Sequence, residues 1–125
     1  MLFTPIATDT VKEKYHGITL EIGRHNSAEF RRKFRRLTKP YKRQIDKDEL
    51  PEDLSIELMC RAMIGTVLVG WEGAKTADGS VYEFTEQNAL DLLIDDVDCR
   101  EFISEVASNL SLFLDQQDEE AKKKP

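Results

Sequence analysis

The sequence predicts a mainly α-helical, small α+β domain with four helices and one or two short β-strands. Two observations indicate this class: four segments carry apolar residues at helical spacing, and only two short segments alternate apolar with polar residues. A length of 125 residues is enough for one domain with its own hydrophobic core. We expect that domain over residues 17–116, between a loosely held arm (1–16) and a flexible charged tail (117–125).

The two predicted strands are short. Residues 18–22 (Ile-Thr-Leu-Glu-Ile) alternate in polarity after a His-Gly turn signal. Residues 81–84 (Val-Tyr-Glu-Phe) alternate in the same way and follow the turn signal Asp78-Gly79. The second strand either pairs with the first or folds back locally.

The first predicted helix begins with a capping signal, Asn26, and has Glu29 in the capping-box position. Its apolar stripe has spacings of four, three, four and four residues and consists of Phe30, Phe34, Leu37, Tyr41 and Ile45. Pro40 removes a backbone donor from this pattern, so we expect a kink or break near Thr38-Lys39.

Three further helices are expected. The second begins in the acidic, proline-containing segment 48–53, and its buried stripe, which includes Met59, extends from Leu54 to Val67. Residues 63–71 are apolar nearly all round, which predicts a helix end in the core and a buried Trp71. Thr85 is the expected cap of the third helix and Asp98 that of the fourth.

The charge is strongly segregated. The chain has 18 Lys and Arg against 24 Asp and Glu, a net charge of −6. Residues 24–47 alone hold ten basic and two acidic side chains, so the rest carries a net −14. The basic segment is either a solvated face that pairs with the acidic half or a protein partner, or a phosphate-binding surface for nucleic acid. Because the whole chain is acidic and lacks a base-reading motif, we expect no nucleic acid partner.

The sequence contains no constellation typical of catalysis or metal binding. Only two histidines are present, the cysteines Cys60 and Cys99 stand alone, and no glycine-rich phosphate loop occurs. The acidic group Asp95, Asp96 and Asp98 fits the end of one helix and the cap of the next. We therefore expect no enzyme activity, no cofactor and no metal. We also expect reduced thiols, no membrane span and a cytoplasmic protein, because neither a long apolar run nor a signal-like N-terminus is present.

Residues 16–115 resemble the tail assembly chaperones of siphophage-type bacteriophages, whose tails are long and non-contractile. The resemblance is carried by an apolar helix that ends in Trp-Glu (63–73), a glycine turn with an extended piece, the helix start at 85–93, and an aspartate-capped closing helix at 98–107. The Lys/Arg-rich segment before a proline-started helix fits the same pattern.

The resemblance implies a function. Such proteins are not enzymes, act in the host cell cytoplasm and are absent from the mature virion. They bind and solubilise the tape measure protein, a very long helical protein that sets tail length. They also help recruit the major tail tube protein, often through a longer form made by ribosomal frameshifting. The resemblance further implies a homo-oligomer. The alternatives are a small nucleic-acid-binding regulator that uses the basic helix 24–47, and a structural adaptor of the phage particle.

A chaperone for an amphipathic helical client needs exposed apolar surface with charge around it. The first predicted helix offers both. The candidate protein-binding residues are Phe30, Arg31, Phe34, Arg35, Leu37 and Tyr41. The alternative is that the apolar members of this set pack on the domain's own core.

Overall fold

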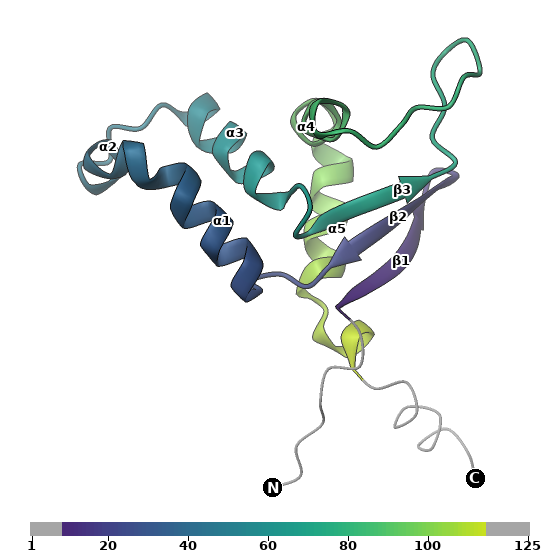
Figure 1. Cartoon of the computed structure of the whole chain (residues 1–125), viewed down its shortest axis with the longest axis horizontal. Helices are drawn as coiled ribbons and strands as arrows, with labels where there is room; N and C mark the ends of the chain where they lie inside the picture. Colours follow the sequence, from purple (N-terminus) through teal and green to yellow (C-terminus); the bar gives the residue numbers. More distant parts are fainter. Residues whose placement is uncertain (1–8, 115–125) are drawn as a thin grey trace, which may run out of the picture.

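The computed structural model describes residues 9–114, in which an antiparallel sheet and four helices of ten or more residues form an α+β fold (Figure 1). The sheet has the order β1-β2-β3, with bounds Thr10–Tyr15, Ile18–Gly23 and Leu68–Glu72. The mainly helical α+β class is confirmed. The described part of the chain has three strands, rather than the one or two expected.

Strand β1 corrects the C-terminal part of the predicted arm (residues 1–16), since residues 10–15 pair along their whole length with β2. The turn between them is His16-Gly17, and both residues have positive φ, 48° and 82°. Such a two-residue turn matches the right-handed twist of a hairpin. The turn signal was visible in the sequence, but its partner strand was overlooked. Residues 1–8 lie outside the described part.

Strand β3 corrects the prediction of a helix through residues 63–71. Helix α3 spans Glu52–Met63, and Gly65 follows with a φ of +81°, a conformation that glycine adopts without strain. The chain then returns as β3 alongside β2. A short apolar run is compatible with either a buried helix end or a strand. Here the bend at Gly65 ends the helix, so the run that follows forms a strand. The strand predicted at 81–84 is reduced to a single bridge between Lys75 and Val81.

The remaining helices largely follow the sequence signals. The first predicted helix is α1 (Ala28–Thr38), a 3₁₀ turn η1 (Lys39–Tyr41) and α2 (Lys42–Asp46), so the break at Pro40 is confirmed. Helices α4 (Glu86–Asp95) and α5 (Val97–Ser108) precede a final turn η2 (Leu110–Phe113). Thr85 caps α4 as predicted, whereas α1 and α5 are capped by Ser27 and Asp96 instead of Asn26 and Asp98.

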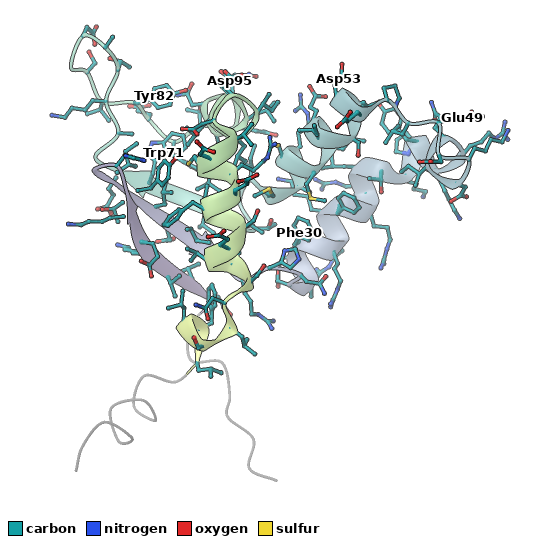
Figure 2. The ribbon with its side chains drawn as sticks, turned by 180° about the vertical axis from the view of Figure 1, so that it is seen from behind. Phe30, Glu49, Asp53, Trp71, Tyr82 and Asp95 are labelled. Atoms are coloured by element: carbon teal, nitrogen blue, oxygen red, sulfur yellow. The ribbon has the colours of Figure 1, made fainter. Side chains whose placement is uncertain are left out.

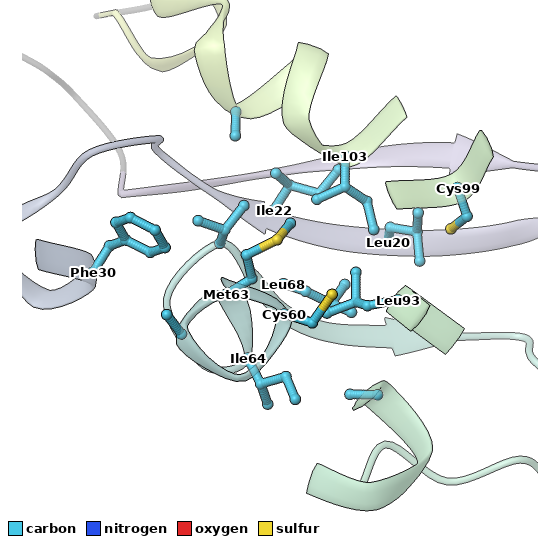
Figure 3. Packing of buried hydrophobic residues seen from close by; sticks show 14 of the residues in the cluster. Leu20, Ile22, Phe30, Cys60, Met63, Ile64, Leu68, Leu93, Cys99 and Ile103 are labelled. Carbon is cyan, nitrogen blue, oxygen red and sulfur yellow. The ribbon is translucent and has the colours of Figure 1, made fainter. Parts of the chain in front are cut away.

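The core lies where α3, α4 and α5 meet one face of the sheet (Figure 3). Leu20 and Ile22 of the central strand face Ile103 of α5, and both strand residues are fully buried. Helices α1 and α3 run together away from the sheet, with α2 at the far end (Figure 1). We call α1, η1 and α2 the basic arm.

Trp71 lies at the edge of this core, which corrects the prediction that it is buried within it. The side chain is half-buried on β3, and its indole stacks on Tyr82 at 5.6 Å and meets Phe84 edge-on at 4.8 Å. Its Nε1 donates to the carbonyl of Tyr82 at 2.7 Å. Trp71 therefore holds the connector between β3 and α4 against the sheet (Figure 2).

Candidate functional site

A groove of about 460 Å³ lies between α1, α3 and α5. Its apolar surface comes from Phe30, Met59, Met63 and Val67. Phe30 projects from α1 on the side of the arm nearest α5 (Figure 2). Polar side chains surround this surface: His25, Arg100, Glu101, Ser104 and Glu105.

A second hollow of about 220 Å³ lies farther along α1 and α3. It is lined by Phe34, Thr38, Ile45, Asp48, Leu50, Ser55 and Leu58. Phe34 stacks on Phe30 at 5.9 Å, and Ser55 precedes Met59 by one helical turn. The two hollows therefore follow one seam between α1 and α3, with exposed apolar side chains at Met59 (40% exposed) and Ile45 (42%).

Two contacts fix α1 as a wall of the groove. The Lys33 ammonium on α1 donates to the carbonyl of Ile64 at 2.6 Å, at the end of α3. Burial lowers the pKa of Lys33, while nearby Glu86 acts in the opposite direction. Just before α1, the backbone N–H of His25 donates to the carbonyl of Ala107 on α5 at 2.8 Å. The middle of α1 is thus tied to the end of α3 and the segment before α1 to α5, so the groove is already formed in the isolated chain.

The opposite wall is the outer face of α5. The Asp96 carboxylate caps this helix by accepting from the N–H of Cys99 at 3.0 Å. Arg100 turns toward α4 and donates from Nη1 to the carbonyl of Leu93 at 2.9 Å. Glu101 and Glu105 stay exposed one turn apart and line the groove. This wall therefore presents carboxylates to whatever occupies the groove.

The structure divides the predicted site residues into two groups. Phe30 is buried, while Phe34, Leu37 and Tyr41 are half-buried, and Phe34 and Leu37 pack against the core. Arg31 and Arg35 are exposed. Much of the apolar stripe therefore faces the domain, which was the alternative considered for it. Of the predicted set, only Phe30 and Phe34 line the two hollows.

Sequence reasoning missed Met59, Met63, Glu101 and Glu105 as groove residues. Met59 was assigned to the buried stripe of the second helix, but 40% of it is exposed because α1 and α5 leave that part of α3 uncovered. The signal that could have indicated the groove is the pair of methionines one turn apart, because flexible Met side chains are common on adaptable binding surfaces.

The cations of the basic arm form no ion pair with the described acidic half. Within residues 9–114 the ion pairs are Lys12–Glu72, at 3.7 Å, and Glu57–Arg61, at 3.6 Å. Neither involves α1 or α2. Seven exposed cationic side chains of the arm and the adjacent Lys47, eight in all, are thus available to a partner: Arg31, Arg32, Arg35, Arg36, Lys39, Lys42, Arg43 and Lys47.

The described residues contain no group of three or more His, Cys, Asp or Glu side chains placed to hold a metal ion. In the same range, none of the helices combines the length and apolar character needed to cross a bilayer. Both cysteines are free and buried.

The buried thiols give a first testable prediction. Burial raises the pKa of Cys60, and burial with nearby Asp96 raises that of Cys99 to about 11. At pH 8 the reactive thiolate is therefore scarce and inaccessible in the folded protein, and we expect alkylation by iodoacetamide to be slow until denaturant is added. Mass spectrometry over time measures this. Rapid labelling of both thiols in the native protein, as fast as in urea, would contradict it.

The comparisons with known proteins place the chain by family. The protein is a small α+β protein with a partly apolar groove between three helices. Residues 25–124 match the family model described as YdaY prophage protein, and the chain belongs to this family. The match includes α1, α3 and α5, the helices that form the groove. No curated protein and no solved structure matches the chain significantly. The family confirms that the protein is phage-derived, as the sequence resemblance implies.

Proposed function

We propose that this prophage protein is a non-catalytic tail assembly chaperone. Its groove binds an amphipathic helical segment of the tape measure protein and keeps that protein soluble in the host cytoplasm. The observation that carries the proposal is the apolar groove between α1, α3 and α5, with Met59 exposed on its floor. Phage origin and the sequence resemblance to tail assembly chaperones supply the context.

The shape of the groove favours a helical occupant. Its walls are helices, and the second hollow continues it along α1 and α3. An amphipathic helix places side chains three and four residues apart on one face, which suits a seam with successive apolar hollows. Met59 and Met63 can adjust their rotamers to different side chains, as a chaperone for a long and varied client requires.

The other partners follow from the same proposal. A longer, frameshifted form recruits the major tail tube protein to the coated tape measure protein. Copies of the chain also associate with one another, because the exposed cations of the basic arm complement the remainder of the chain, which carries a net charge of −14.

Nucleic-acid binding by the basic arm is the second candidate function, and the eight exposed cations favour it. Against it, the groove beside the arm is apolar and is bordered by Glu101 and Glu105, which repel a polyanion. We expect the dissociation constant for duplex DNA at physiological salt to be above about 1 μM, as for non-specific binding.

The test is co-expression with overlapping fragments of the tape measure protein encoded in the same prophage. We expect at least one fragment to be soluble only when the chain is present, and to co-purify with it. DNA binding is measured in parallel by fluorescence anisotropy at two salt concentrations. If no fragment is solubilised or co-purified, the chaperone proposal is wrong. Submicromolar DNA binding at physiological salt would favour the nucleic-acid alternative.

A further inference from the structure

The groove has edges of opposite charge in addition to its apolar floor. One edge is on α1 and the other on α5. Because the helices are separate elements with fixed positions, their charges meet opposite flanks of anything that lies in the groove.

The α1 edge is basic. Arg31 and Arg35 follow Phe30 and Phe34 by one residue each, and Thr38 continues their row at helical spacing. Thr38 lines the second hollow, so the row lies on the side of α1 that borders the seam, although Arg31 and Arg35 themselves line neither hollow. Arg35 is exposed, and Arg31 is also exposed although its Nη1 donates to the Asn26 carbonyl at 3.2 Å.

The α5 edge is acidic. Glu101 and Glu105 line the groove, and Asp98 precedes Glu101 by about one turn with its side chain exposed. The one cation on this wall, Arg100, is engaged by the Leu93 carbonyl at 2.9 Å. This neutral acceptor leaves the Arg100 charge in place, but the three carboxylates of Asp98, Glu101 and Glu105 outnumber it, so the edge is acidic.

We infer that the groove selects helices whose apolar stripe has acidic side chains along one flank and basic side chains along the other. The acidic flank lies against Arg31 and Arg35, and the basic flank against Glu101 and Glu105. Turning such a helix end for end exchanges its flanks, so the two edges also fix the direction in which the occupant lies. This inference rests on the proposed function and names the chemistry of the client segment.

The test uses two synthetic peptides of identical composition, each with the same leucine stripe. In one, Glu and Lys are segregated on opposite flanks; in the other, they alternate on both flanks. We expect the segregated peptide to bind the full-length chain about tenfold more tightly at low salt, as several weak exposed charge pairs add. The difference should shrink at about 0.5 M salt, where such pairs are screened.

Direction is read by energy transfer from a dye at the peptide N-terminus to an acceptor on Ser108→Cys, an exposed position at the end of α5. The same measurement is made on the variant Arg31→Glu/Arg35→Glu/Glu101→Lys/Glu105→Lys, which exchanges the two edges. We expect the exchanged variant to keep its affinity for the segregated peptide but to reverse its direction. Circular dichroism checks that the variant, altered only at exposed positions, remains folded.

The outcomes separate this inference from the proposed function. Equal affinities for the two peptides, both abolished by Met59→Asp, would leave the groove as a helix-binding site and overturn the role of its edges. An unchanged direction in the exchanged variant would overturn it as well. If neither peptide binds, both the inference and the proposed groove are wrong.

Discussion

Met59→Asp is expected to weaken binding of the tape measure fragment by about 2 kcal/mol, roughly thirtyfold, the size of effect seen when a central interface contact is lost. Met59 is the exposed part of the groove floor. A carboxylate at this position would lose its hydrating water when the client binds, without gaining a hydrogen-bond or ionic partner. The protein should stay folded, since the side chain is 40% exposed and aspartate costs only about 0.6 kcal/mol in a helix. Isothermal titration with a fragment that remains soluble at low concentration measures the affinity.

The matched control is Val81→Asp. Val81 is also an exposed apolar residue, 73% exposed, and it lies in the connector outside the two hollows. We expect this variant to bind like the parent protein. If the two variants lose affinity equally, the effect is one of net charge and the groove is not the binding site.

Gly23→Ala has the largest expected effect on stability, a loss of about 3 kcal/mol in the free energy of unfolding. A Cβ at this position would lie 2.1 Å from the carbonyl oxygen of Thr66. The contact is with backbone, and the Gly23 N–H also donates to the Val67 carbonyl at 2.7 Å, so neither segment can move without losing a hydrogen bond. Urea denaturation measures the difference.

Gly70→Ala is the control for this prediction. Gly70 lies in the adjacent strand β3, and an added Cβ would meet nothing within 4 Å. We expect a change within about 0.5 kcal/mol. Equal destabilisation by the two substitutions would mean that β2 and the segment after α3 are less closely packed than described.

The sequence was most informative where a helix has a local start or stop. The cap at Thr85 and the break at Pro40 depend on neighbouring residues alone, and both were predicted. Strand β3 was not, because its pairing with β2 joins segments about 50 residues apart in the sequence. Strand β1 was not predicted either, although it pairs with β2 across the adjacent two-residue turn His16-Gly17. From the apolar pattern alone, residues 68–72 are predicted as a helix end. In the structure they form a strand, because Gly65 bends the chain and Gly23, which has no side chain, lets the segment after α3 approach β2 closely.

The candidate site was predicted only in part, for a similar reason. Phe30 and Phe34 could be found because apolar periodicity marks the inner face of a helix. Which part of α3 remains uncovered depends on the spacing of α1 and α5. That spacing is set by the Lys33–Ile64 and His25–Ala107 hydrogen bonds, which no local pattern reveals. The charge segregation was evident, but its arrangement as two edges of one groove required the fold.

Binding of a helical client in the groove is tested most directly by methyl NMR of the chain with ¹³C-labelled methionine methyl groups. The chain has three methionines, and two of them, Met59 and Met63, line the groove. On titration with the tape measure fragment, we expect both groove signals to shift and to saturate at the affinity measured by calorimetry. A fragment that binds while the Met59 and Met63 signals stay unchanged would contradict the groove as the client site.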